Sequence, residues 1–243
     1  KAVSYADVLS PTITDTIDAD LIGKAGPQLK MIANFGAGVD HIDIDAAVGR
    51  GLIVTNTPGV LTEDTADITM ALILAVPRRL MEGVRVVEAD GFEGWSPTWM
   101  LGRRVAGKRL GIVGMGRIGR LTAGWWAALG TRVKAYDPFA TFDNVTQASL
   151  DEVLEQSDVV SLHLPLNADT RNMINAAVLK RMRKGSVIVN VSRGGLIDEP
   201  ALAEALHEGH IAGAALDVFA KEPLPADNAL RNAPNVILTP HVA

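Results

Sequence analysis

The sequence contains no cysteine among its 243 residues. Disulfide bonds and thiolate metal sites are therefore excluded, and the absence fits a reducing compartment. Long apolar runs are missing as well, since the longest, Met70 to Val76, is far too short to cross a bilayer. No secretory signal is visible, and we expect a cytoplasmic protein without a membrane span or a bound metal.

The sequence also has fewer basic than acidic residues. The chain carries 23 Lys and Arg against 28 Asp and Glu, which gives a formal net charge of −5. A protein that binds nucleic acid presents a basic surface, so nucleic acid is not expected as a partner. The length allows one large or two small domains with a sizeable core.

One stretch organises the rest of the chain. Between Lys108 and Gly119 a short apolar run leads into Gly-x-Gly-x-x-Gly, and a helical pattern and a second apolar run follow. In a dinucleotide fold, Gly114 allows the tight turn, Gly116 lets a pyrophosphate approach, and Gly119 lets helix and strand pack closely. The N–H groups of the new helix would hold the phosphates, and Asp137 would bind the adenosine ribose. This order of elements predicts an NAD site.

Apolar runs and helical patterns alternate on both sides of this stretch, which predicts parallel α/β structure. A glycine loop at residues 36–38 follows an early strand and is either an anion site or a simple turn. A long apolar helix over residues 66–89 should be largely buried and should be kinked or divided by Pro77. From residue 110 onward six strands are expected, at 110–113, 132–136, 159–164, 187–191, 214–218 and 236–238.

Polar residues stand at the ends of three of these strands. Arg193 follows the fourth strand, Asp217 lies at the end of the fifth with Glu222 five residues later, and His241 follows the sixth. Arginine can bind a carboxylate through two parallel hydrogen bonds, and histidine is the natural acid near neutral pH. A carboxylate beside the histidine favours the imidazolium. Each residue alone has an ordinary structural interpretation, and only their joint placement favours a catalytic set.

The other histidines are expected outside the chemistry. His41, His207 and His210 are expected at the surface. His163, at the end of the third strand, should line the cofactor cleft.

Taken together, these motifs resemble the D-2-hydroxyacid dehydrogenase family and occur in its order along nearly the whole chain. The resemblance implies an α/β fold of two Rossmann-like lobes, one with a six-stranded parallel dinucleotide-binding sheet and a smaller, here incomplete, flavodoxin-like substrate lobe. Residues 1–62 would form the substrate-binding domain without its N-terminal part. Residues 63–243 would form the NAD-binding domain, including the interdomain helix. The motifs are Gly114–Gly119, Ser161–Pro165, Val189–Gly194, Leu216–Phe219 with Glu222-Pro223, and Thr239–His241.

The resemblance also implies roles for single residues. Arg193 would bind the substrate's carboxylate and carbonyl, and His241 would act as acid and base, paired with Glu222. Asp217 would lie near the nicotinamide amide. The backbone N–H groups of the loop around Ala37, Gly38 and Val39 would meet the substrate carboxylate. The remaining residues implied in NAD binding are Gly114, Gly116, Arg117, Ile118, Gly119, Asp137, His163, Pro165, Thr170 and Ser192.

The predicted activity is the reversible, NAD-dependent reduction of a small 2-oxo acid to the D-2-hydroxy acid. Residues 56–62 are most similar to glyoxylate and hydroxypyruvate reductases, and Glu222 argues against the formate dehydrogenase branch. Two alternatives stay open: an NAD-sensing, corepressor-like interaction module, and a phosphoglycerate or phosphite dehydrogenase. Members of the family are usually dimers, so a homodimer is expected, with the apolar segment 92–101 as a contact region.

Overall fold

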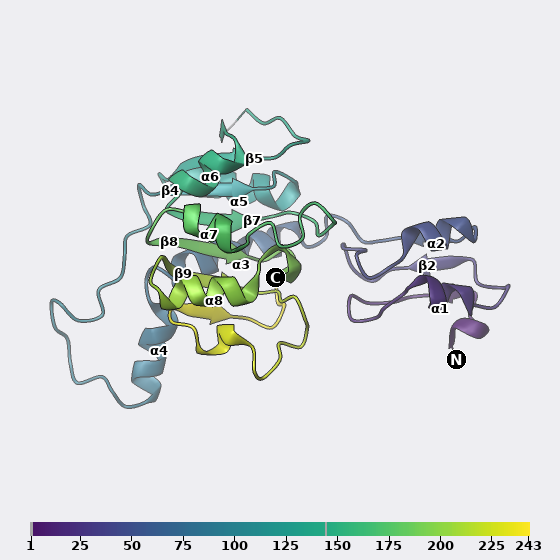
Figure 1. The fold of residues 1–243 in the computed structure, drawn as a ribbon, viewed down its shortest axis with the longest axis horizontal. Helices are drawn as coiled ribbons and strands as arrows, with labels where there is room; N and C mark the ends of the chain where they lie inside the picture. Colours follow the sequence, from purple (N-terminus) through teal and green to yellow (C-terminus); the bar gives the residue numbers. More distant parts are fainter. Residues whose placement is uncertain (1, 144) are drawn as a thin grey trace. The chain divides into compact units, whose positions relative to one another are not determined.

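The structure, a computed structural model, describes residues 2–143 and 145–243 (Figure 1). The chain divides into two compact units, Lys1–Leu61 and Thr62–Ala243. The division falls directly before Thr62 because this residue begins the first helix of the larger unit. That the smaller unit binds substrate stays a prediction.

The smaller unit is a three-stranded parallel sheet with two short helices. Strand β2 lies between β1 and β3. Asp18 and Asp43 begin the two helices, because each side chain accepts a backbone N–H that the first turn would otherwise leave unpaired. The core is aliphatic and includes Ile22 and Ile32. The elements are η1 (Ala2–Ser4), β1 (Val8–Leu9), α1 (Ala19–Gly23), β2 (Met31–Ala33), α2 (Ile44–Gly49) and β3 (Ile53–Thr55).

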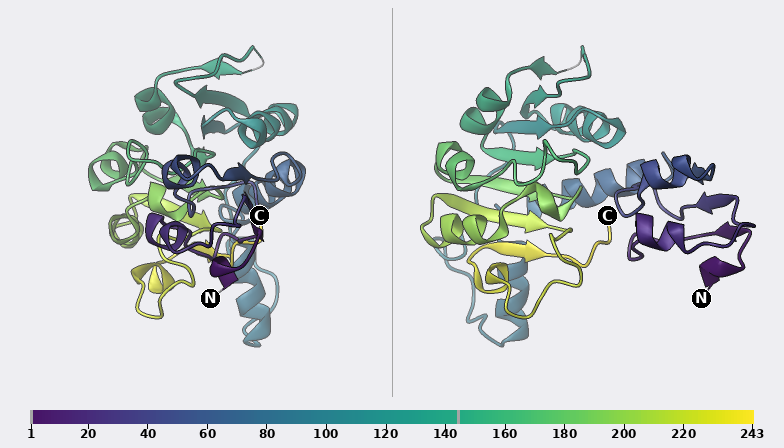
Figure 2. Two further views of the ribbon diagram at one scale, coloured as in Figure 1. Left: turned by 90° about the vertical axis from the view of Figure 1, so that its right-hand side faces the viewer. Right: turned by 45° about the vertical axis from the view of Figure 1, so that its right-hand side comes forward.

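The larger unit is built on a parallel sheet, and its strands run in one direction in the right-hand view of Figure 2. Over the described residues the sheet has seven strands, in the order β10-β9-β8-β7-β4-β5-β6. The prediction of six strands is therefore wrong by one. The additional strand, β6, consists of two exposed residues at the sheet edge. The sequence therefore has no apolar run from which this strand could be predicted. The strands are β4 (Arg109–Val113), β5 (Arg132–Tyr136), β6 (Thr146–Gln147), β7 (Val159–Leu162), β8 (Ser186–Asn190), β9 (Ile211–Leu216) and β10 (Val236–Leu238).

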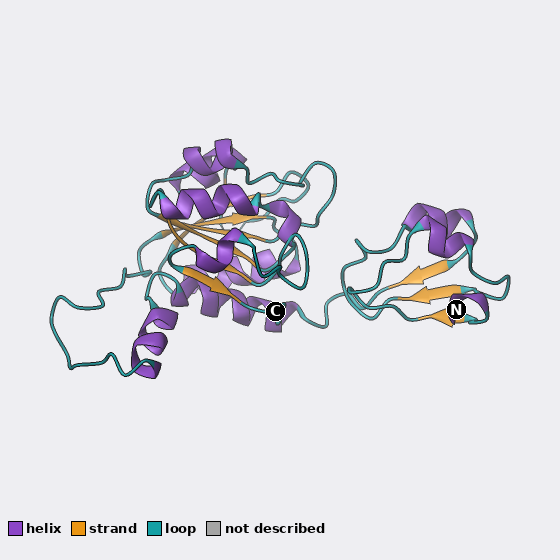
Figure 3. Ribbon diagram, turned by 60° about the horizontal axis from the view of Figure 1, so that its bottom comes forward, coloured by secondary structure: helices purple, strands orange, loops and turns teal. Residues whose placement is uncertain are grey.

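Helices cover both faces of this sheet, as Figure 3 shows. One apolar cluster joins the sheet to α3 and α5 and includes Ile73 and Trp126. A second cluster joins it to α6, α7 and α8 and includes Leu179 and Leu202. The predicted doubly wound α/β fold is confirmed. The helices are α3 (Thr62–Ala75), α4 (Leu80–Glu88), α5 (Arg117–Ala128), α6 (Leu150–Gln156), α7 (Ala176–Arg181), η2 (Gly194–Leu196), α8 (Glu199–His207) and η3 (Ala229–Asn232).

The strand order fixes where a ligand can bind. From β4 the chain builds the sheet outward through β5 and β6, and it then returns to the other side of β4 with β7. Such a reversal opens a crevice at the carboxyl ends of the two central strands, where doubly wound sheets bind nucleotides. The glycine loop follows β4, and His163 follows β7.

The helix predicted over residues 66–89 is divided, as the position of Pro77 predicts. Helix α3 ends at Ala75, and α4 begins at Leu80 after Arg79 has adopted a left-handed conformation with φ 56°. The expected burial holds for α3 only, because α4 has no buried residue. Helix α4 and the loop after it extend from the body of the larger unit at the lower left of Figure 1. Most of their apolar side chains are exposed.

None of the helices formed by residues 2–143 and 145–243 is long and apolar enough to cross a membrane.

Candidate functional site

The glycine loop after β4 has the geometry of a phosphate cradle. Gly114 has φ 99°, and a Cβ atom added there would lie 2.4 Å from the carbonyl oxygen of His163. A Cβ atom added at Gly119 would lie 2.0 Å from the carbonyl oxygen of Gly114, whereas beside Gly116 nothing lies within 4 Å. Gly114 and Gly119 thus exclude a side chain because backbone atoms pack closely there, and Gly116 leaves open space. A dinucleotide pyrophosphate fits this arrangement.

Helix α5 begins directly at this open position. Its N-cap residue is Gly116, which provides no side chain to cap the helix, and Arg117 and Ile118 follow in the first turn. The N–H groups of a first turn have no partner within the helix and carry partial positive charge. The start of α5 is therefore able to bind an anion such as a phosphate group.

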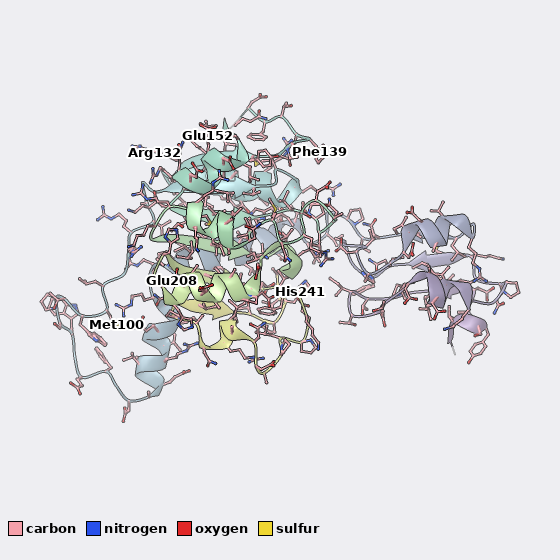
Figure 4. The ribbon with its side chains drawn as sticks, viewed as in Figure 1. Met100, Arg132, Phe139, Glu152, Glu208 and His241 are labelled. Carbon is pink, nitrogen blue, oxygen red and sulfur yellow. The ribbon has the colours of Figure 1, made fainter. Side chains whose placement is uncertain are left out.

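Asp137 directly follows β5, beside the same loop. One carboxylate oxygen accepts the N–H of Met115 at 2.7 Å, and the other accepts the N–H groups of Phe139 and Ala140. The carboxylate thus ties the end of β5 to the glycine loop, a structural role that the sequence did not indicate. The Arg120 guanidinium lies on the carbonyl oxygens of Met115 and Thr141. The phenyl ring of Phe139, two residues after Asp137, is 97% exposed, and Figure 4 labels it.

His163 lies under the glycine loop at the end of β7. Its Nε2 atom is 2.9 Å from the Ser161 hydroxyl, and burial lowers the pKa of the imidazole to about 4. The ring is therefore neutral at physiological pH. The Ser192 hydroxyl donates to the Leu162 carbonyl and joins the loops after β7 and β8. Thr170 donates to the carbonyl of Pro165 at 2.8 Å and so closes the loop after β7.

The side chains of His241 and Glu222 are in direct contact. The Nδ1 atom of His241 lies 2.8 Å from a carboxylate oxygen of Glu222, and both side chains are partly exposed. The other carboxylate oxygen accepts the N–H of Phe219 at 3.0 Å. Over the described part of the chain, no partner is recorded for Nε2 of His241. This pairing leaves Nε2 as the nitrogen that can exchange a proton with a bound molecule.

Arg193 lies on the neighbouring loop, after β8. Its backbone carbonyl accepts Nδ2 of Asn190 at 2.9 Å, and its guanidinium contacts the carbonyl of Ser192. A Cβ atom added at Gly194 would lie only 1.8 Å from the carbonyl carbon of Phe219. The Arg193 loop therefore packs directly against the loop that carries Glu222.

Asp217 is fully buried at the end of β9. Its carboxylate accepts the Thr239 hydroxyl at 2.6 Å and the N–H groups of Val242 and Ala243 at 3.0 and 2.8 Å. These partners surround His241, which adopts φ 55° between them. Asp217 thus fixes the segment that presents His241. Its predicted contact with the nicotinamide amide stays a prediction.

The glycine loop of the smaller unit turns its carbonyl groups inward. The buried side chain of Asn34 donates to the carbonyls of Gly36 and Gly38, and Asn56 donates to that of Ala37. Among the described residues, the N–H groups of Ala37, Gly38 and Val39 have no recorded partner. Three neighbouring free N–H groups can together bind an anion. This favours the anion site over the simple turn.

Several of the residues that build these sites were not predicted. They are Asn34, Asn56, Asn190, Thr239 and Glu199, whose side chain reaches the loop of Glu222. His41, expected at the surface, instead lies against Asn34 with its Nε2 atom 2.9 Å from Oδ1. The described residues include no cluster of three or more metal-ligating side chains.

Comparison with known proteins places the chain in a dehydrogenase family. The model of the D-isomer specific 2-hydroxyacid dehydrogenase NAD-binding domain matches residues 70–243. A glyoxylate reductase of Korarchaeum cryptofilum is 45% identical, and the alignment covers all of this chain and 75% of that protein.

Solved structures agree with this finding. The TT0316 protein of Thermus thermophilus superposes with a TM-score of 0.93 at 45% identity, over 99% of this chain and 76% of that one. The D-lactate dehydrogenase of Aquifex aeolicus, solved with NAD and lactic acid, superposes with a TM-score of 0.89 at 33% identity, over 99% of this chain and 77% of that one.

Proposed function

Because this chain belongs to the D-isomer-specific 2-hydroxyacid dehydrogenase family, we propose that it reduces glyoxylate to glycolate and hydroxypyruvate to D-glycerate. The chain is an NAD-dependent oxidoreductase of 2-hydroxy acids. The choice of substrate is supported by its similarity to a glyoxylate reductase over its whole length. The comparisons do not favour the corepressor, phosphoglycerate or phosphite alternatives.

One observation carries the proposal for the reaction, namely the pairing of His241 with Glu222 at 2.8 Å. When bound, NADH supplies a hydride to the carbonyl carbon of the substrate. His241 donates the proton from Nε2 to the carbonyl oxygen, and the negative charge of Glu222 favours the protonated ring before transfer. In the oxidation direction, neutral His241 accepts the hydroxyl proton.

Arg193 is proposed to hold the 2-oxo acid. Its guanidinium can bind the carboxylate through two parallel hydrogen bonds and can polarise the carbonyl. The close packing of Gly194 on Phe219 supports this role, because it keeps the arginine loop next to the loop of Glu222. For the smaller unit, the proposal is that the N–H groups of Ala37, Gly38 and Val39 bind the substrate carboxylate.

NAD is proposed to bind along the carboxyl ends of β4, β5 and β7. The open space at Gly116 and the start of α5, with Arg117 and Ile118, would take the pyrophosphate. Asp137 would accept the ribose hydroxyl groups with the lone pairs that its backbone partners leave free. The loops of His163, Pro165, Thr170, Ser192 and Asp217 would enclose the rest of the cofactor.

We also propose that the chain forms a homodimer in the cytoplasm. The exposed apolar side chains of α4 and of segment 92–101 support a dimer, because a contiguous apolar patch of this kind usually marks a contact surface. Trp95 is 83% exposed and Val87 is 65% exposed. The absence of cysteine fits a reducing compartment.

A panel of 2-oxo acids assayed with NADH tests the substrate. We expect the highest kcat/KM for glyoxylate and hydroxypyruvate, and a lower value for pyruvate and for phosphohydroxypyruvate. His241→Ala serves as the control and should lose most activity on every substrate. A preference for the phosphorylated acid would overturn the proposed substrate, and undiminished turnover by His241→Ala would overturn the proposed acid.

A further inference from the structure

Glu199 is a buried carboxylate for which the proposed reaction gives no reason. It occupies the first position of α8 and is only 7% exposed. One oxygen accepts the N–H of Ala220 at 2.6 Å, and the other accepts Nδ2 of Asn228 at 2.7 Å. Burial of a charge is costly unless strong hydrogen bonds compensate it. Both oxygens are directed at a single loop, residues 219–228, so this loop is where the function of Glu199 is to be sought.

This loop carries Glu222. The N–H of Phe219 binds the carboxylate of Glu222, and the next N–H along the chain, that of Ala220, binds the carboxylate of Glu199. Two adjacent backbone donors are thus held by two different carboxylates. Hydrogen bonds to a carboxylate are roughly twice as strong as those between neutral groups. The backbone of Phe219, whose N–H orients Glu222, is therefore held on its other side by the hydrogen bond from Ala220 to Glu199.

The backbone between Phe219 and Ala220 is confined from other directions as well. Gly194 packs against the backbone of Phe219 so closely that no side chain fits between them. Asn228 uses its amide oxygen to accept the N–H of Leu230 and its amide nitrogen to reach Glu199, so it fixes the far end of the loop. Arg231 binds the carbonyls of Leu224 and Pro225 and closes the loop between these points.

We propose that Glu199 is a positioning residue that holds Glu222 against His241, and that it thereby controls how readily His241 carries the proton for reduction. The inference rests on the acid–base role proposed above for His241. Without Glu199, the N–H of Ala220 is left unpaired and the loop loses its link to Asn228. Glu222 then no longer stays at one place beside the imidazole, and the protonated ring loses its partner.

The alternative is that Glu199 acts through its charge alone. Two other carboxylates are recorded near His241: Glu222 contacts the ring, and Asp217 binds the backbone of Val242. A charge effect of Glu199 would not depend on Glu222, whereas a positioning effect acts only through Glu222. A double-mutant cycle between Glu199 and Glu222 separates the two explanations.

The test uses Glu199→Gln in the full chain. The variant keeps the shape of the side chain but replaces one carboxylate oxygen with an amide NH₂ group. This group cannot accept a hydrogen bond, so either the bond from Ala220 or the bond from Asn228 is lost. The matched control is Glu204→Gln, which removes a carboxylate from the exposed face of the same helix. For each variant, kcat and KM for glyoxylate reduction are measured against pH, and NADH binding is measured by fluorescence.

We expect Glu199→Gln to lower kcat several-fold and to shift the decline of the reduction profile toward lower pH, as Glu222→Gln does. NADH binding should stay near that of the parent, and Glu204→Gln should match the parent throughout. In the Glu222→Gln background, Glu199→Gln should add nothing. Asn228→Ala removes the other end of the link without any change of charge, and it should shift the profile in the same direction.

Three outcomes overturn the proposal. A parent-like profile for both Glu199→Gln and Asn228→Ala, beside a shifted Glu222→Gln profile, shows that the link does not position Glu222. An equal shift in both backgrounds assigns the effect to charge alone. A parent-like profile for Glu222→Gln contradicts the acid–base pair itself and so identifies the proposed function as the failing step. If Glu199→Gln does not fold, Asn228→Ala decides the question.

Discussion

Among single residues, Arg193 is proposed to bind the substrate carboxylate through two parallel hydrogen bonds. A lysine keeps the charge but cannot form two parallel hydrogen bonds with a carboxylate. A hydrogen bond to a charged group contributes about 1.5–3 kcal/mol, so Arg193→Lys should lower kcat/KM for glyoxylate by about tenfold to hundredfold. NADH titration should give nearly the affinity of the parent. A variant with parent-like kcat/KM would place the carboxylate clamp elsewhere.

His163 predicts a loss of stability in acid. Burial lowers its pKa from 6.5 to about 4. Between these pH values the imidazole is therefore protonated in the unfolded chain and neutral in the folded chain. Stability should therefore fall as the pH drops from about 6.5 to about 4, with a loss from this group of about 3 kcal/mol. Urea unfolding at a series of pH values measures the effect.

The control for this prediction is His163→Gln, which cannot titrate and can still reach Ser161. Over the same pH range, the variant should lose less stability than the parent. Equal losses in the two proteins would show that the imidazole does not resist protonation in the folded state.

The sequence predicted the residues proposed to act on the substrate, but it did not predict the residues that hold them in place. His241, Glu222 and Arg193 stand out because each is a polar side chain in the loop that follows an apolar strand. Glu199 looks like an ordinary acid in the first turn of a helix, where the helix dipole favours it. Its partners, Ala220 and Asn228, lie more than twenty positions away, and only the folded loop brings them together.

Among the elements, α4 gives a prediction about the oligomeric state. Leu80, Val84 and Val87 line one side of the helix, next to Met100. If this side is the dimer contact, Val84→Glu combined with Val87→Glu should convert the dimer to monomers, because carboxylates would be buried in an apolar interface. Sedimentation velocity measures the change.

Arg85→Glu is the matched control, since it changes the net charge of the same helix by the same amount without touching the apolar side. It should leave the dimer intact. A parent-like sedimentation coefficient for the double variant, or dissociation by Arg85→Glu, would contradict the assignment of this surface.

Element boundaries were predicted well where apolar runs are strong and poorly elsewhere. The alternation of strands and helices and the break at Pro77 follow from local pattern. The exposure of α4 does not, because an apolar helix indicates burial without showing whether the covering surface is the same chain or another. The short strand β6 pairs through its backbone only, and its polar residues resemble a loop.

At the scale of the whole molecule, the sheet order and the acid at the end of β5 predict the cofactor. A 2′-phosphate beside Asp137 would place two like charges about 4 Å apart, which costs roughly 4 kcal/mol at an effective dielectric near 20. The Nε and Nη2 atoms of Arg120 donate to two backbone carbonyls, which leaves fewer of its donors for a 2′-phosphate. We expect a clear preference for NADH over NADPH in kcat/KM. Equal activity with NADPH would contradict the role of Asp137.

The central claim is that one histidine, paired with one carboxylate, exchanges the proton in both directions of the reaction. The most direct test measures glyoxylate reduction and glycolate oxidation against pH, for the parent and for Glu222→Gln. Reduction needs His241 protonated and oxidation needs it neutral, so the reduction rate should fall and the oxidation rate should rise through the same pH range. In Glu222→Gln both transitions should move to lower pH, and profiles that superimpose on those of the parent would contradict the claim.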